Sequence, residues 1–292
     1  MIDWPDELID DIAKRKSILY LGSGVSANCV NDVGKHPATW EAFLRDILLN
    51  KSSELGTADQ IIIELIDKND YLMACEIIIN ILGNRVFGEL AADEFRRPGY
   101  HPTELHETIF KLDSKIVITP NIDSIYDQYA MQSSNGTILI KKYTENIAPT
   151  LRSPDYLIIK AHGTIDDPNH IVFTHGQYSR ARNEYSGFYR ILDALMLTHT
   201  FIFIGCGISD PDIQLILENS NFSFPHCRPH YMIAANETIN PNVRDCLIQN
   251  RNLQFLTYDN TDGTHSQLFE ALKILDDLVD IKRQEIASNI SW

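Results

Sequence analysis

Cysteine is scarce in this sequence, and its spacing argues against both a disulfide-bonded domain and a zinc-binding one. Five cysteines occur among 292 residues, and no two of them form a C-x-x-C pair. An odd count without such a pair argues against a disulfide framework and against a four-cysteine zinc site. Hydrophobic residues make up 44% of the chain, which is enough to form a large core without disulfide bonds or a structural metal. We therefore expect a protein of the reducing cytoplasm.

Basic residues and long apolar runs are also few. Lysine and arginine total 25 against 40 acidic residues, which gives a net charge of −15. Such a surface is a poor binder of nucleic-acid phosphates, so direct nucleic-acid binding is not expected. No apolar run approaches the ~20 residues that cross a bilayer, and the acidic start Met1 to Leu8 has no signal-peptide core. We expect no membrane association.

Short apolar runs separated by helical patterns indicate an α/β fold. The runs expected to form strands are 17–21, 115–119, 137–142, 156–161, 170–174, 201–204, 230–234 and 253–258. Several are apolar throughout, which is typical of a mostly parallel, Rossmann-like sheet with helices on both faces. A purely helical pattern over about 52–112 predicts a helical insertion within one domain, 1–292. A long helix is expected from about Tyr178 to Thr198, and a further amphipathic helix at about 265–290.

Glycine or polar residues follow four of these strands, where ligands of open parallel sheets bind. They are the turn Gly22-Ser23-Gly24-Val25-Ser26, the pair Asn121 and Asp123, the dipeptide His162-Gly163, and the turn Gly205-Cys206-Gly207-Ile208-Ser209. The glycines allow a sharp turn and close approach of the backbone to an anion. Each motif alone also has a plain structural interpretation. Asn121 suits a turn amide, His162 a core histidine, and Asp123 a helix cap.

Taken together and in this order, the four motifs resemble the sirtuin (SIR2) superfamily over roughly residues 15 to 260. In that family a G-A-G-x-S turn, a T-Q-N-x-D strand end, an H-G pair and a later glycine-serine turn surround NAD. The resemblance implies a role for each matching residue. Gly22, Ser23, Gly24, Val25 and Ser26 would hold the pyrophosphate, Asn121 and Asp123 the nicotinamide ribose side, His162 would be the general base, and Gly205, Gly207, Ser209 and Asn236 would complete the cofactor site.

The sequence also departs from the sirtuin deacylases. Pro120 replaces the glutamine of T-Q-N-x-D, and only 164–169 separate His162-Gly163 from the next expected strand. The cysteine pairs of the deacylase zinc module are missing, so we expect no zinc or other metal. An acidic residue about 20 positions after the first turn would be Glu41, inside an expected helix, which disfavours dehydrogenase chemistry. These departures resemble the SIR2-like proteins of bacterial anti-phage defence, which hydrolyse NAD.

The residue types suit that reaction. Cleavage of the nicotinamide glycosidic bond builds positive charge on the ribose, and a neutral asparagine can position hydroxyls or water without trapping the cation. A histidine with an ordinary pKa of about 6.5 can accept a proton at neutral pH. The leaving group is already a pyridinium and needs no general acid. The sequence therefore predicts an NAD+ glycohydrolase with Asn121 and His162 as catalytic residues.

An unregulated NADase would kill its host, so we expect control in trans. The resemblance points to two-component systems in which a SIR2-like subunit forms homo-oligomers and assembles with a HerA-type ATPase. Two other functions stay open at this point. One is an NAD-dependent protein deacylase or ADP-ribosyl transferase, and the other is a non-catalytic subunit that binds NAD or ADP-ribose.

Overall fold

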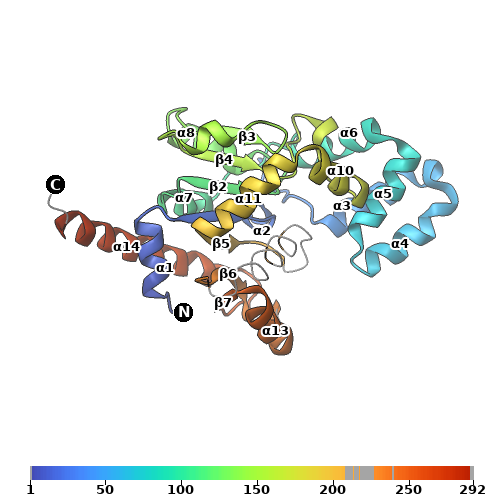
Figure 1. Ribbon diagram of the computed structural model, residues 1–292. Helices are drawn as coiled ribbons and strands as arrows, with labels where there is room; N and C mark the ends of the chain where they lie inside the picture. The colour runs from blue at the N-terminus through green and yellow to red at the C-terminus, as the bar shows by residue number, and fades with distance from the viewer. Residues whose placement is uncertain (1, 208–212, 214–216, 218–226, 239, 290–292) are drawn as a thin grey trace.

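The computed structural model describes residues 2–207, 213, 217, 227–238 and 240–289 (Figure 1). Its centre is one sheet of seven strands in the order β3-β4-β2-β1-β5-β6-β7, with every neighbouring pair parallel. The strands are β1 (Ser17–Leu21), β2 (Ile116–Thr119), β3 (Leu139–Lys142), β4 (Leu157–Lys160), β5 (Thr200–Ile204), β6 (His230–Ala235) and β7 (Leu253–Tyr258). Because β2 and β5 flank β1 on opposite sides, the strand order reverses at β1, where such folds bind ligands. The predicted Rossmann-like α/β fold is confirmed.

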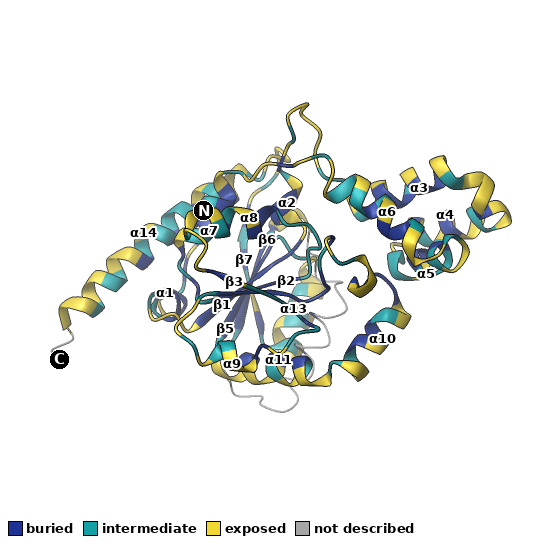
Figure 2. Ribbon diagram, turned by 90° about the horizontal axis from the view of Figure 1, so that it is seen from above, coloured by how far each residue is buried: buried dark blue, intermediate teal, exposed yellow. Residues whose placement is uncertain are grey.

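Helices cover both faces of the sheet, which explains why the central strands are apolar on both sides. Every residue of β1, β2, β4 and β5 is buried. One face packs against α1 (Asp6–Ala13), α7 (Glu104–Lys111), α8 (Ile125–Ser133) and α14 (Ser266–Asn289), and the other against α9 (Ala148–Leu151), α10 (His175–Glu184) and α11 (Ser186–Thr198). Figure 2 shows the buried strands between these two layers. The remaining sheet-side elements are α2 (Gly24–Ala27), η2 (Pro168–His170), η3 (Asn236–Thr238) and α13 (Pro241–Arg251).

A helical lobe stands beside the sheet (Figure 1). It consists of α3 (Trp40–Leu55), η1 (Gly56–Ala58), α4 (Asp59–Asp67), α5 (Tyr71–Leu82) and α6 (Asn84–Phe95). Its own core includes Phe43 and Phe87, and Phe173 from the sheet side packs into it, with ring centroids 5.1 Å from Phe87. The expected insertion over 52–112 differs from this packing at both ends. Helix α3 belongs to the lobe, whereas α7 covers the sheet.

Two expectations about the chain after β4 are wrong. Residues 170–174 form no strand, and the helix expected from Tyr178 to Thr198 is broken at Tyr185 into α10 and α11. Gly163, with φ of +83°, turns the chain so sharply that a Cβ there would lie 2.3 Å from the carbonyl oxygen of His170. The apolar residues that follow therefore fill the space between the sheet and the lobe.

Among the described residues, no single helix is both long and apolar enough to span a membrane. Helices α5 and α6 reach that length and composition only as a pair bent by 120°.

Candidate active site

The two predicted glycine turns pack directly against each other at the point where the strand order reverses. The N–H of Gly24 donates to the carbonyl oxygen of Gly205 at 2.9 Å, and the N–H of Gly22 donates to Ile204 at the same distance. A Cβ on Gly22 would lie 2.4 Å from the carbonyl oxygen of Gly205, and one on Gly24 would lie 2.8 Å from its Cα. These glycines are therefore required by turn-to-turn packing as well as by any ligand.

The end of β2 is tied to the first turn by side chains. Asn121 donates from Nδ2 to the carbonyl oxygen of Gly22 at 2.9 Å, and its Nδ2 lies 3.4 Å from Ser26 Oγ. The Ser26 hydroxyl donates to Asp123 Oδ2 at 3.0 Å. The other carboxylate oxygen of Asp123 accepts the N–H of Ile125, the first residue of α8, at 3.0 Å. The structure thus brings together Ser26, Asn121 and Asp123 beside the glycine backbone.

His162 follows the neighbouring strand in matching register. Thr119 of β2 pairs with Lys160 of β4, so Asn121 and His162 both lie two positions beyond a paired residue. The His162 side chain is only 7% exposed. The hydroxyl of Tyr178, from α10, lies 3.2 Å from its Nε2, and the two rings meet edge to face with centroids 5.0 Å apart. Helix α10 therefore sets the orientation of the predicted general base.

The remaining predicted residues are more loosely connected to this cluster. Gly205 packs on the first turn, and Gly207 lies exposed just beyond it. Asn236 is exposed at the start of η3, after β6, and no hydrogen bond joins it to either turn within the described residues. Ser209 lies outside the described residues. Cys206 packs against the backbone of Tyr20 and Ile204, in keeping with a small packing residue.

A second buried histidine, His106, lies near this cluster and was not predicted from the sequence motifs. His106 is fully buried, accepts the Thr103 N–H at Nδ1, and lies 3.8 Å from the Cys29 thiol through Nε2. Burial lowers the pKa of His106 to about 4 and raises the pKa of the Cys29 thiol to about 12. Both groups are neutral at pH 7, so neither suits proton transfer. The spacing of Thr103 and His106 is that of a capping box, the one sequence signal for this arrangement.

Sequence reasoning also missed a buried ion pair below the predicted site. Lys160, the last residue of β4, is 1% exposed and pairs with Asp127 of α8, with Nζ 2.8 Å from Oδ2. The available signal was a lysine that ends an otherwise apolar strand. Such a side chain is almost never buried without a partner.

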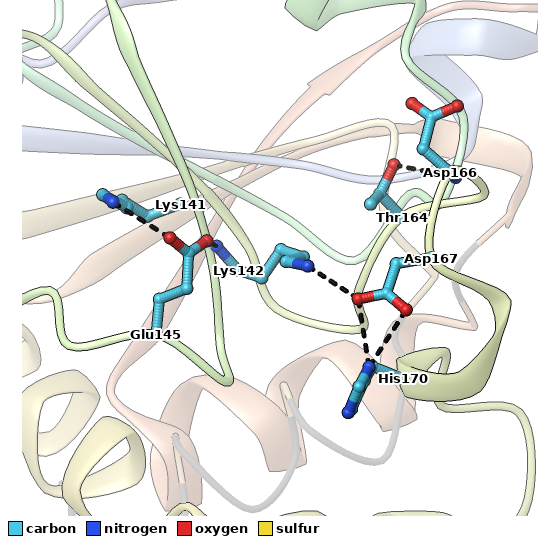
Figure 3. A network of polar contacts seen from close by, with 7 residues as sticks. All are labelled: Lys141, Lys142, Glu145, Thr164, Asp166, Asp167 and His170. Atoms are coloured by element: carbon cyan, nitrogen blue, oxygen red, sulfur yellow. Dashed lines mark hydrogen bonds and ion pairs between the residues drawn. The ribbon is translucent and has the colours of Figure 1, made fainter.

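A cavity of about 810 Å³ lies between α8, the ends of β3 and β4, and residues 164–167. Figure 3 shows part of its rim, where Lys142 Nζ contacts Asp167 at 2.6 Å and Lys141 Nζ contacts Glu145 at 2.9 Å. The lining residues include Lys142, Lys160, Asp127, Glu145, Asp166 and Asp167, and none of the glycine-turn residues. Each lining lysine is already paired with a carboxylate. The cavity therefore offers poor neutralisation for a pyrophosphate, and the cluster beside the glycine turns remains the candidate site.

Within the part of the chain that the structure describes, no group of three or more histidine, cysteine or acidic side chains is placed to hold a metal ion.

These features define a class: a doubly wound α/β protein whose glycine turns and polar strand ends meet at the carboxyl edge of a parallel sheet. The family follows from comparison with known proteins. Residues 115–258 match the family described as SIR2-like domain. This part of the chain is thus SIR2-like, and the resemblance predicted from the motifs is confirmed.

Several curated proteins are similar to this chain. NAD(+) hydrolase ThsA of Acinetobacter baumannii is 24% identical over 78% of this chain and 44% of its own length. The ThsA of Enterococcus faecium is 29% identical over 45% of this chain and 28% of its own length. Defense-associated sirtuin 2 of Bacillus subtilis is 24% identical over 72% of this chain and 20% of its own length. The chain spans less than half the length of each of these relatives.

Proposed function

We propose that this protein hydrolyses NAD+ to nicotinamide and ADP-ribose and acts in anti-phage defence by depleting NAD+. The observation that carries the proposal is the contact of Ser26, Asn121 and Asp123 beside paired glycine turns, with His162 on the adjacent strand end. Relatives named NAD(+) hydrolase support the choice of reaction. The cytoplasm, where NAD+ is available, is the proposed location.

In the proposed reaction, a water oxygen bonds to C1′ of the nicotinamide ribose as the bond from C1′ to the pyridinium nitrogen breaks. The bonding electrons return to that nitrogen, which leaves as neutral nicotinamide, and the proton lost by water passes to His162 and then to solvent. Asn121 is held by the Gly22 carbonyl and positions the ribose hydroxyls or the water. The Asp123 carboxylate favours the developing positive charge.

For the rest of NAD+, we assign Gly22, Ser23, Gly24, Val25 and Ser26 to the pyrophosphate, and Gly205, Gly207, Ser209 and Asn236 to the adenosine half. The N–H groups of Gly22 and Gly24 already donate to the carbonyl oxygens of Ile204 and Gly205, and those of Val25 and Ser26 donate within the first turn. The part of the glycines is therefore close backbone approach, and we assign donation to the phosphates to Ser23.

Nicotinamide release from NAD+, followed by chromatography, tests this function. We expect His162→Ala to lower the rate by about 10²-fold or more, as loss of a positioned general base typically does. We expect Asn121→Ala to lower it by about 10²-fold, because the reacting groups lose their positioning. Asn80→Ala, an exposed change on α5, is the matched control and should leave the rate unchanged. Retained release in both site variants would place the chemistry elsewhere.

We further propose that assembly controls this activity, through homo-oligomers and a HerA-type ATPase in trans. The apolar face of α14 is covered by its own domain, since Leu272 and Leu275 are buried against the sheet layer that contains α1 and α7. A partner would therefore meet other surfaces. Release that rises more than linearly with protein concentration, or on addition of a co-purifying ATPase, is the expected result. A rate per subunit that is independent of both would contradict control by assembly.

The second candidate is a non-catalytic subunit that binds NAD or ADP-ribose, favoured by the engaged N–H groups of the first turn. It predicts nucleotide binding with no release above that of Asn121→Ala under any assembly condition. A deacylase or ADP-ribosyl transferase would instead show nicotinamide release that depends on an added acyl-lysine peptide or protein acceptor.

A further inference from the structure

The buried ion pair of Lys160 and Asp127 lies directly below the loops that carry the proposed catalytic residues. Both side chains are buried, at 1% and 5% exposure. Removing two charges from water costs several kcal/mol per ion, so a buried pair is weak evidence for a stabilising role. The geometry around the ammonium group indicates a more specific one.

Lys160 Nζ makes a second contact, donating to the backbone carbonyl oxygen of Asp123 at 2.6 Å. Asp123 follows Asn121 in the loop after β2, and its carboxylate accepts the Ser26 hydroxyl. Lys160 itself ends β4, two residues before His162. One ammonium group therefore joins the loop of Asn121 and Asp123 to the strand of His162, while Asp127 of α8 holds that ammonium in place.

Other hydrogen bonds hold the same loop at Asn121 and Ile122, and Lys160 holds it at the carbonyl oxygen of Asp123. The Asn121 N–H donates to Thr119 Oγ1, and the carbonyl of Ile122 accepts the N–H of Ile165. Among the described residues, the Asp123 carbonyl has Lys160 as its side-chain donor. A charge-assisted hydrogen bond is about twice as strong as a neutral one. Loss of this hydrogen bond would loosen the loop at Asp123, whose carboxylate accepts the Ser26 hydroxyl.

We propose that Lys160, oriented by Asp127, is a positioning residue for NAD+ hydrolysis. It fixes the loop of Asn121 and Asp123 relative to His162 and does not touch the substrate. This inference rests on the proposed function, because it assigns that loop and that histidine to one reaction. Displacement of a reacting group by about 1 Å can lower a rate ~10²-fold, so a small shift of the loop has a large effect.

The test replaces the charged pair by apolar side chains. Lys160→Met alone would leave Asp127 buried without a counter-charge and could unfold the protein. The double variant Lys160→Met with Asp127→Leu removes both charges, a change that is often neutral for stability. If the pair only stabilises the fold, this double variant should keep the wild-type kcat. We expect it instead to fold, to bind ADP-ribose within about threefold of wild type, and to lose ~10²-fold in kcat.

Asp127→Asn is the second variant. It keeps the shape of the carboxylate but leaves the buried Lys160 without a counter-charge, so its kcat is compared only where circular dichroism shows a folded protein. We expect a smaller loss of kcat with little change of KM. Arg228→Met is the matched control, because Arg228 pairs with the buried Asp11 near the start of β5, away from the site. It should lower stability without changing kcat. Wild-type kcat in the double variant and in Asp127→Asn would overturn the proposal.

A readout that needs no turnover separates this inference from the proposed function. The side-chain amide resonance of Asn121, assigned by NMR from its loss in Asn121→Ala, reports the position of the loop. We expect it to shift in the double variant and not in Arg228→Met. If wild type releases no nicotinamide under any assembly condition but the resonance shifts, the proposed function fails, while the structural control of the Asn121 loop by Lys160 stands. An unshifted resonance overturns the positioning role, whatever the rate.

Discussion

At the scale of single residues, close backbone approach at the glycine turns is a tight constraint on the candidate site. Gly22 and Gly24 face the backbone of Gly205, and backbone atoms cannot move aside as a flexible side chain can. Gly205 itself has φ of +65°, in the region that favours glycine. The two turns therefore behave as one unit, and a methyl group on either side must displace the other.

The expected consequence is that Gly24→Ala destabilises the protein by about 1–3 kcal/mol, the usual cost of overpacking. Nicotinamide release should fall with it, since Asn121 is held by the same turn. Urea denaturation followed by circular dichroism measures the stability. Gly187→Ala on α11 is the control: nothing lies within 4 Å of its added Cβ, and a helical position should gain up to about 1 kcal/mol. Equal effects of the two changes would contradict the role of turn packing.

The limits of sequence reasoning are clearest at this scale. The motifs indicated that Ser26, Asn121, Asp123 and Gly205 gather at one edge, because parallel strands end on the same side. They did not show that Gly22 and Gly24 donate their N–H groups to the carbonyl oxygens of Ile204 and Gly205, nor that Lys160 reaches the Asp123 carbonyl. Those contacts depend on the strand register and on the path of each loop, which no local pattern encodes.

At the scale of elements, α10 connects the candidate site to the face of the sheet behind it. Tyr178 lies in the core shared with α11 and β5, and its hydroxyl reaches His162. The sequence predicted one helix from Tyr178 to Thr198, and the apolar spacing across the break is indeed helical. At Tyr185 the backbone leaves the helical region, with φ of −111° and ψ of 37°, and the ring meets Tyr143 edge to face with centroids 5.2 Å apart.

Removing the Tyr178 hydroxyl should leave the His162 ring less firmly oriented, while the Tyr178 ring still fills its place in the core. We expect Tyr178→Phe to lower kcat about fivefold, as one hydrogen bond worth about 1 kcal/mol would, with little change in melting temperature. Tyr185→Phe, on the same face but outside contact with His162, is the control. Identical kinetics for wild type and Tyr178→Phe would show that the Tyr178 hydroxyl does not orient His162 for the reaction.

At the scale of the whole molecule, buried histidines couple folding to pH. Burial lowers the pKa of both His106 and His230 to about 4, so the folded chain keeps them neutral. The unfolded chain protonates them near pH 6.5, about their ordinary pKa. Since the unfolded state then binds more protons, stability falls as the pH drops from about 6.5 toward 4.

Each such histidine contributes up to about 1.4 kcal/mol of lost stability per pH unit in this window. His230 accepts the Phe201 N–H at Nδ1, a bond that an asparagine carbonyl can replace. We therefore expect His230→Asn to flatten the fall of the unfolding free energy between about pH 6.5 and 5, measured by urea titration at several pH values. His36→Asn, at an exposed position, should leave the slope unchanged. An unchanged slope in His230→Asn would show that other groups drive acid unfolding.

The strand order also sets when the site can exist during synthesis. Strand β1 pairs with β2 early in the chain, but the turn after β1 is completed only by Gly205, after β5. Domains form progressively as a chain leaves the ribosome, and pairings between distant segments form late. A nascent chain that ends before β5 holds Asn121 and His162 without the second glycine turn. The proposed NAD+ site would therefore be incomplete until most of the polypeptide has been made.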